Sequence, residues 1–254
     1  MTHLIRLAEL MSRELFQNDA YMRACDAVVV ESNPNEKWFS VDQTVFYPLG
    51  GGQPGDTGVA FYKNDAEFAI VDTRRARDTG EILHFVDEVA ELPEAGTELH
   101  MEINWERRYL HMRVHSCLHL LSATVPGKIT GAQVYAGRGR VDFDVRYPQE
   151  KHYIAESLNA LIQKEARRIS RVFTRAEIEA SPSLMKNLSV PLPEGVDEIK
   201  LVHFENLDIQ PCGGTHVANT MEIGEVKVDK IESKGKRNRR VSISLVDTAV
   251  EPNY

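Results

Sequence analysis

Cysteine and tryptophan are scarce, with three and two copies in 254 residues. Cys25, Cys117 and Cys212 are too few and too scattered to build a disulfide framework, which favours a reducing compartment and leaves the thiols free for other chemistry. The chain also lacks a run of about 18 apolar residues, and its N-terminus lacks a charged head followed by an apolar core. These absences predict a cytoplasmic protein with no membrane association.

Positive charge is in deficit overall. Thirty Lys and Arg against 38 Asp and Glu give a formal net charge of −8, a field that repels phosphates and argues against sequence-indifferent coating of nucleic acid. The segment Lys234–Arg240 is a local exception, with five cations in seven residues. Most such runs are solvated hairpin tips, but the strand-like patterns on both sides favour a basic tip held in place.

The first part of the chain has a sequence pattern typical of a β-barrel. After a weakly helical arm over residues 1–24, short apolar or alternating runs separated by turn residues continue from residue 25 to about residue 104. This pattern predicts a small antiparallel barrel. We therefore expect two domains, a β-barrel domain with a glycine-rich loop over residues 1–100 and a second domain over residues 101–254.

The second part mixes helices and strands. A helix is expected over Trp105–Thr124, ended by Pro126 and Gly127, and a second helix from Gln149 to about Ser170. Thr174 and Glu177 form a capping box for a shorter helix. Strands are expected at Ile129–Tyr135, Arg140–Val145 and Ile199–Glu205, with a closing hairpin of Glu222–Glu232 and Arg239–Val246.

A glycine-rich segment occupies residues 46–58. Gly50, Gly52 and Gly55 formally satisfy the dinucleotide pattern G-x-G-x-x-G, but Pro54 stands where a helix should begin and a strand pattern follows from Val59. These features exclude a Rossmann site. Two interpretations stay open: a tight turn that uses glycine for positive φ, or a loop whose bare backbone approaches a ligand.

Two pairs of metal-ligating residues stand about ninety positions apart. His115 and His119 lie one turn apart on a single helix face, and Cys212 and His216 repeat the spacing of four. Either pair alone is a weak signal, but together they supply a thiolate and three imidazoles, a set typical of zinc. His111 lies on the same helical stripe, and the spacing alone leaves it as an alternative ligand.

The pattern limits what a metal would do. Ser116 stands where a zinc peptidase carries its general-base glutamate, so peptide hydrolysis lacks its usual base. Four protein ligands favour a structural ion, whereas a catalytic ion needs one displaceable ligand. An ester is an easier target than an amide, and a polarising zinc with bound water suits it.

Three motifs together resemble a known family. They are Phe46-Tyr-Pro-x-Gly-Gly-Gly-Gln-Pro-Gly-Asp-Thr-Gly58, Arg113-x-His-Ser-Cys-x-His-Leu-Leu121 and Cys212-Gly-Gly-Thr-His216. They look like the editing region of alanyl-tRNA synthetase, and with no synthetase core ahead of them the chain resembles the free-standing alanyl-tRNA editing proteins, the AlaX family. The glycine-rich part matches the longer class of these proteins.

The resemblance implies an α+β fold, with a translation-factor-like antiparallel β-barrel followed by an α/β editing domain that has an antiparallel sheet. It implies trans-editing, the hydrolysis of the ester between tRNA(Ala) and a wrong amino acid, chiefly serine with glycine as a second candidate. It implies one Zn²⁺ per chain, held by His115, His119, Cys212 and His216, so that His111 either supports these ligands from behind or belongs to the core. We expect no membrane partner and no obligatory protein partner.

Further site residues follow from the resemblance. Thr130 and Gln133, on the strand after the metal helix, are candidates to read the serine hydroxyl, and Gly213, Gly214 and Thr215 are expected to contact the substrate, with backbone N–H groups stabilising an oxyanion. The expected tRNA contacts are Gly51, Gly52 and Gln53 in the loop, and Lys234, Lys236, Arg237, Arg239 and Arg240 at the basic tip.

Two other functions stay open. One is a zinc-stabilised tRNA-binding module without catalysis, in which the metal supports only the fold. The other is a zinc hydrolase for a different substrate, which the missing helix glutamate and the basic tip disfavour.

Overall fold

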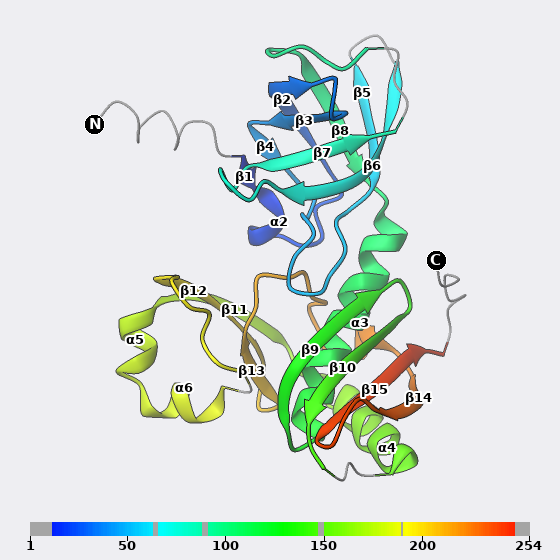
Figure 1. Ribbon diagram of the computed structural model, residues 1–254, viewed down its shortest axis with the longest axis vertical. Helices are drawn as coiled ribbons and strands as arrows, with labels where there is room; N and C mark the ends of the chain where they lie inside the picture. Colours follow the sequence, from blue (N-terminus) through cyan, green and yellow to red (C-terminus); the bar gives the residue numbers. More distant parts are fainter. Residues whose placement is uncertain (1–11, 63–65, 88–90, 147–149, 189, 247–254) are drawn as a thin grey trace. The chain divides into compact units, whose positions relative to one another are not determined.

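The structure is a computed structural model that describes residues 12–62, 66–87, 91–146, 150–188 and 190–246 (Figure 1). It divides into two compact units: Met1–Gly50 with Pro54–Arg108, and Gly51–Gln53 with Tyr109–Tyr254. The division therefore falls later than residue 100, inside a helix. The reason lies in the first helical turn, where Trp105 packs on the core of the first unit and Arg108 pairs with Asp56.

The first unit is a closed barrel of six strands in the order β2-β3-β7-β6-β5-β8. All pairings in it are antiparallel, which confirms the predicted antiparallel barrel. The strands are β2 Ala24–Asn33, β3 Trp38–Val41, β5 Gly58–Tyr62, β6 Glu67–Arg75, β7 Ile82–Val86 and β8 Glu98–Ile103. The likeness to translation-factor barrels stays a prediction.

Alternating side chains build the barrel core. In β8 every second residue is buried, so Leu99, Met101 and Ile103 point inward, as expected where successive side chains point to opposite faces of a sheet. Phe39 and Phe46, both at 0% exposure, fill the same core.

Small elements border the barrel. β1 (Arg13–Glu14) pairs in parallel with β4 (Gln43–Thr44), and one helical turn, α2 (Leu15–Asn18), follows β1. Much of the predicted N-terminal arm lies on residues 1–11, outside the described part of the chain.

The second unit is built around α3 (Trp105–Thr124), which matches the predicted helix at both ends. Every residue from His111 to Leu121 is buried. A four-stranded antiparallel sheet in the order β14-β15-β10-β9 packs against this helix (Figure 1). Its strands are β9 Lys128–Tyr135, β10 Arg138–Asp144, β14 Val226–Ser233 and β15 Asn238–Leu245, close to the predicted positions. Gly139 permits the close packing, since a Cβ there would lie 2.7 Å from Val114.

The predicted helix from Gln149 to Ser170 is wrong in its second half. The helix α4 covers Lys151–Ile162, and residues 168–174 form β11 instead; position 149 lies outside the described residues. Glu165, with a φ of 54°, cannot continue a right-handed helix. The segment after it is rich in β-branched and aromatic residues and pairs along its length with β12 (Glu198–Phe204).

A smaller antiparallel sheet has the order β11-β12-β13, with β13 at Asp208–Pro211. Beside it lie α5 (Arg175–Glu179), which begins with the predicted Thr174–Glu177 capping box, and α6 (Pro182–Asn187). The 3₁₀ helix η1 (Thr220–Ile223) precedes β14. Within the residues described here, the helices are all too short or too polar to cross a membrane.

Candidate metal centre

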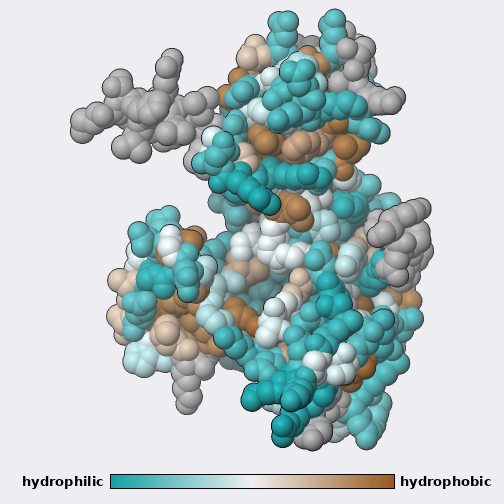
Figure 2. Space-filling model, in the orientation of Figure 1, coloured by the Kyte–Doolittle hydropathy of each residue, from teal (hydrophilic) through white to brown (hydrophobic). Residues whose placement is uncertain are grey.

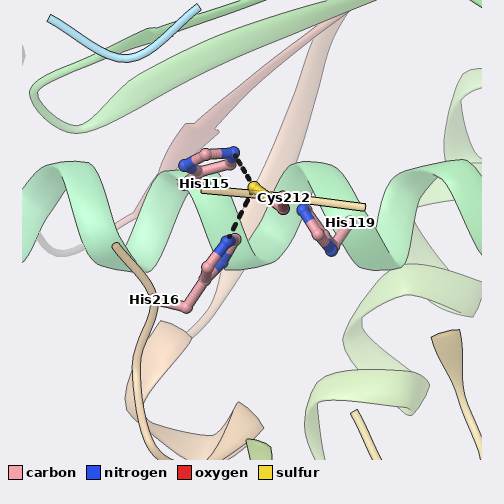
Figure 3. A group of neighbouring side chains, drawn as sticks. All are labelled: His115, His119, Cys212 and His216. Carbon is pink, nitrogen blue, oxygen red and sulfur yellow. Dashed lines mark hydrogen bonds between the residues drawn. The ribbon is translucent and has the colours of Figure 1, made fainter. Parts of the chain in front are cut away.

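Two segments of the second unit bring four ligating side chains together (Figure 3). His115 and His119 project from one face of α3, and Cys212 and His216 come from the segment after β13. One ligand atom from each residue lies within 4.8 Å of the others. The Cys212 Sγ atom lies 3.5 Å from His115 Nε2 and 3.3 Å from His216 Nε2. The four residues singled out by the sequence therefore form one group that can hold a metal ion.

The group is buried except at the cysteine. The three histidines expose 6%, 4% and 1% of their surface, in chain order, whereas Cys212 is half-buried. His111 is also buried, at 1% exposure, and is not part of the group.

Each imidazole is hydrogen-bonded through its outer nitrogen. His115 Nδ1 lies 2.8 Å from Gln53 Oε1 and His119 Nδ1 lies 3.1 Å from Asp208 Oδ2. His216 Nδ1 lies 3.2 Å from Ser116 Oγ. Histidine metal ligands usually have such partners, which fix the ring orientation and the tautomer. The three contacts leave the Nε2 atoms of His115 and His216 directed at Cys212.

These outer partners are themselves held. Asp208 Oδ1 accepts a hydrogen bond of 3.0 Å from Gln210, and Ser116 Oγ accepts one of 3.1 Å from the Val217 N–H. The sequence did not predict that Asp208 and Ser116 orient the histidines, because Ser116 was interpreted only as the residue that replaces a general-base glutamate. A usable signal existed, since a histidine ligand needs a polar partner and Asp208 stands four residues before Cys212.

The electrostatic effects on the group act in different directions, and burial, followed by the charge of His115, lowers the pKa of His216 well below 6.5. Burial raises the pKa of the Cys212 thiol, but the neighbouring His115 and His216 outweigh it and hold that pKa well below 9.0. Burial lowers the pKa of His119, yet the Asp208 carboxylate and the Cys212 thiolate together raise it above its ordinary value. A thiolate and a carboxylate thus face the imidazoles, and a bound cation would be stabilised there.

Glycine at position 214 is required by the packing of the group. A Cβ there would lie 2.2 Å from His115 Cε1 and 2.6 Å from His115 Nδ1. The Gly214 N–H donates to Cys212 Sγ over 3.4 Å, and the Thr215 N–H donates to Gln53 Oε1 over 3.2 Å. Gly213 is different, because it is exposed and a Cβ on it would meet nothing within 4 Å.

The glycine-rich segment reaches this unit through residues 51–53. Gly51 and Gly52 have φ values of 57° and 79°, and a Cβ on Gly52 would lie 2.5 Å from the Ala132 carbonyl oxygen. The Gly52 carbonyl accepts a hydrogen bond of 2.8 Å from the Val134 N–H. The loop therefore needs glycine both for its positive φ values and for its close packing. Its backbone packs against strand β9. Contact of Gly51 and Gly52 with tRNA stays a prediction.

The two candidate hydroxyl readers lie on β9. Gln133 is half-buried and donates from Nε2 to the Gly52 carbonyl over 3.1 Å. Thr130 is exposed, donates to the Asp142 carbonyl over 3.1 Å and accepts from Asn238 over 3.2 Å. Gln133 is therefore bonded to the glycine-rich segment and Thr130 is bonded within its own sheet, and their contact with a substrate stays a prediction.

The basic tip joins β14 to β15, at the lower end of the sheet where Figure 2 shows a concentration of hydrophilic residues. Two of its arginines are paired with acids of β10: Arg237 with Asp144 at 2.9 Å, and Arg240 with Asp142 at 2.7 Å. Arg239 donates to the Gly235 carbonyl over 2.7 Å. Lys234 and Lys236 are exposed, so they are the tip cations best placed to meet a phosphate.

Two family profiles match the chain. The family described as "Threonyl and Alanyl tRNA synthetase second additional domain" matches residues 199–242, which include Cys212 and His216. The family described as "tRNA synthetases class II (A)" matches residues 20–107. Each profile lies almost wholly within one of the two units.

Individual relatives match nearly the whole chain. An alanyl-tRNA editing protein AlaX-M of Methanosarcina barkeri is 36% identical over 246 residues, covering 93% of this chain and 100% of the relative. An AlaX-L protein of Pyrococcus horikoshii is 30% identical, covering 92% of this chain and 58% of the relative. The alanine–tRNA ligase of Sulfurisphaera tokodaii is 34% identical, covering 90% of this chain and 26% of the ligase.

Proposed function

The chain belongs to the family of alanyl-tRNA editing proteins, and we propose that it is a trans-editing hydrolase that deacylates mischarged tRNA(Ala) at a zinc site. The observation that carries the proposal is the buried group of His115, His119, Cys212 and His216 in a chain of this family. The expected substrates are Ser-tRNA(Ala) first and Gly-tRNA(Ala) second.

The donor set fits zinc. A tetrahedral zinc ion, with Zn–S of about 2.3 Å and Zn–N of about 2.0–2.1 Å, places sulfur and nitrogen ligands about 3.6 Å apart. The Cys212 Sγ atom lies 3.5 Å and 3.3 Å from two imidazole nitrogens. One thiolate with three imidazoles is also a ligand set that zinc accepts. The proposal is therefore one Zn²⁺ per chain.

The residues around the group have separate tasks in this proposal. Zinc bound there supplies Lewis-acid chemistry, the polarisation of a substrate group or of water. Cys212, as the half-buried ligand, marks the side from which the aminoacyl ester enters. The Gly214 and Thr215 N–H groups are already engaged, which directs the oxyanion contact to the N–H of the exposed Gly213.

The proposed substrate follows from the weak discrimination of a synthetase pocket between similar amino acids. Serine differs from alanine by one hydroxyl, and an apolar pocket discriminates weakly against an added hydroxyl, so a second site that binds this group is useful. We assign its recognition to Gln133 and Thr130, the polar side chains of β9. The phosphates of the tRNA are assigned to the tip, chiefly to Lys234 and Lys236, and to the backbone at Gly51 and Gly52.

Deacylation tests the proposal directly. Ser-tRNA(Ala), Gly-tRNA(Ala) and Ala-tRNA(Ala) are incubated with the protein and with Cys212→Ala, and zinc content and folding are checked for each. We expect serine to be released much faster than alanine, and the folded Cys212→Ala protein to lose this activity. If no ester is cleaved by folded, zinc-loaded protein, the hydrolase is excluded and the closed four-ligand group favours a zinc-stabilised tRNA-binding module.

A further inference from the structure

Gln53 is a polar side chain with 0% exposure beside the metal group. Its Oε1 atom lies 2.8 Å from His115 Nδ1 and accepts the Thr215 N–H over 3.2 Å. Its Nε2 atom donates to Thr215 Oγ1 over 2.8 Å. A buried amide costs free energy unless it is hydrogen-bonded, and here both ends of the amide have partners.

These contacts determine which way round the amide lies. A backbone N–H can only donate, so the atom that faces the Thr215 N–H must be the carbonyl oxygen of Gln53. The same oxygen then accepts from His115, and His115 Nδ1 must carry a proton. Neutral His115 therefore has its lone pair on Nε2, the nitrogen that lies 3.5 Å from Cys212 Sγ.

Gln53 is restrained at the preceding residue of the backbone and at its side-chain amide. The preceding residue, Gly52, is hydrogen-bonded through its carbonyl oxygen to the Val134 N–H and approaches Ala132 too closely for any side chain. Next to the side-chain amide, Gly214 leaves the room that the contact with His115 needs, because a Cβ on Gly214 would lie 3.2 Å from Gln53 Oε1. The amide is thus held in place before any metal binds.

Only one of the three outer partners is charged. Asp208 brings a carboxylate to His119, and Ser116 brings a hydroxyl to His216. Gln53 brings a neutral acceptor, so it orients His115 without adding a second carboxylate to a group that already contains the Cys212 thiolate. A neutral partner suits a ligand that must keep one proton and offer one lone pair.

We propose that Gln53 is a positioning residue of the zinc centre, which holds His115 as the Nδ1–H tautomer with Nε2 directed at the metal. This role rests on the proposed zinc site. It differs from the tRNA contact that the sequence analysis predicts for Gln53, and it gives the Gly51–Gln53 segment a task within the second unit.

Zinc affinity tests the role without relying on catalysis. Zinc dissociation constants are measured by competition with a chromophoric chelator for the intact protein, Gln53→Met, Gln53→Glu and Thr215→Val. Gln53→Met keeps the length but loses the acceptor, and we expect zinc to bind about 10–100-fold more weakly, as is typical when an outer partner is lost. Gln53→Glu keeps an acceptor and should recover part of this loss. Thr215→Val removes only the hydroxyl contact and should change the affinity least.

A second measurement needs no variant. In the zinc-loaded wild-type protein, two-bond ¹H–¹⁵N correlation spectra of the imidazoles report which nitrogen of His115 carries the proton. We expect a protonated Nδ1 and a metal-bound Nε2. A His115 protonated on Nε2, or a folded Gln53→Met protein that binds zinc as tightly as wild type, overturns the role of Gln53 and leaves the zinc site standing. A wild-type protein that binds no zinc overturns both.

Discussion

Arg108 and Asp56 form an ion pair in which both side chains are buried, at 0% and 1% exposure. The Arg108 Nε–H donates to both carboxylate oxygens, and the remaining guanidinium nitrogens reach the carbonyls of Ala20 and Val45 at 3.0 Å and 2.6 Å. Asp56 also accepts the Tyr47 N–H over 2.7 Å. The pair thus ties the first turn of α3 to the glycine-rich segment inside the barrel unit.

Arg108→Met should strongly destabilise the barrel unit. It leaves the Asp56 carboxylate buried without its cation, and breaking a buried pair in this way costs about 3–5 kcal/mol. Both tryptophans, Trp38 and Trp105, belong to this unit, so their fluorescence in a urea titration reports its unfolding.

The control for this experiment is an exposed pair of the same unit. Arg74 and Asp72 lie 2.6 Å apart with 57% and 28% of their side-chain surface exposed. Such pairs contribute about 1 kcal/mol or less, so Arg74→Ala should shift the unfolding midpoint little. Equal effects of Arg108→Met and Arg74→Ala would contradict the assignment of Arg108 to the barrel core.

His84 should make the barrel unit sensitive to acid. It is buried between Phe39 and Phe46 and hydrogen-bonded to Thr44, and burial lowers its pKa from 6.5 to about 4. Between these two pH values His84 is protonated in the unfolded chain but not in the folded chain. The free energy of unfolding is therefore highest above pH 6.5 and falls as the pH drops toward 4. The loss is roughly 3 kcal/mol at most.

Urea titrations of wild type and His84→Gln between pH 4 and pH 7 measure this effect. The variant cannot titrate at this position, so its unfolding free energy should change less with pH than that of wild type. His100 provides the contrast, because it is exposed and its hydrogen bond to Asp26 raises its pKa. Its contribution is therefore present at low pH and lost as the pH rises. An unchanged pH profile in His84→Gln would show that His84 is not the acid-sensitive group.

Gly214→Ala should damage the metal group, whereas Gly213→Ala should not. A Cβ at position 214 meets His115 at 2.2 Å, but one at position 213 meets nothing within 4 Å. We expect Gly214→Ala to weaken zinc binding at least about tenfold, since a displaced histidine ligand loses its alignment. Zinc content after dialysis against a weak chelator measures the difference. Similar zinc retention by the two variants would contradict this prediction, because it would mean that the Cys212–His216 segment can shift and avoid the clash with His115.

Removal of zinc should expose a single reactive thiol. Cys212 is half-buried and its pKa is held low, whereas burial raises the pKa of Cys25 to about 11 and that of Cys117 to about 12. Because the thiolate is the nucleophile, iodoacetamide should label Cys212 alone in folded, zinc-free protein. Zinc loading should block the labelling, as should Cys212→Ser, with peptide mass spectrometry as the readout. Equal labelling with and without zinc would contradict Cys212 as a ligand.

The sequence predicted the elements whose signals are local. The helix Trp105–Thr124 is closed by a Pro-Gly pair, and the capping box at Thr174 lies at the predicted residues. The prediction extended the helix beyond the end of α4, because the apolar residues continue at helical spacing there. Residues 168–174 form a strand instead because they pair with β12, about thirty residues away in the sequence. Pairing partners at that distance leave no mark in a local pattern.

The metal site also has a part that the sequence predicts and a part that only the structure shows. Regular spacing pointed to His115, His119, Cys212 and His216, and the fold brings them together. The outer partners follow no spacing: Gln53 stands 62 residues from His115 and Asp208 stands 89 from His119. Only the folded chain shows that the Gln53 amide is buried, or that two arginines of the basic tip are already paired with β10.

The exposed cations of the basic tip should bind the phosphates of the tRNA. Lys234 and Lys236 are exposed, whereas Arg240 is fixed to Asp142 by two hydrogen bonds of 2.7 Å and 2.8 Å. Replacing both lysines by glutamate should raise KM for Ser-tRNA(Ala) several-fold with little change in kcat, because phosphate contacts position the tRNA and take no part in the chemistry. The slope of log affinity against log salt should fall by about one for each lost contact. Lys227→Glu, on the exposed side of β14, changes charge in the same direction and should leave KM close to wild type. An unchanged KM in the double variant would assign phosphate binding to another surface.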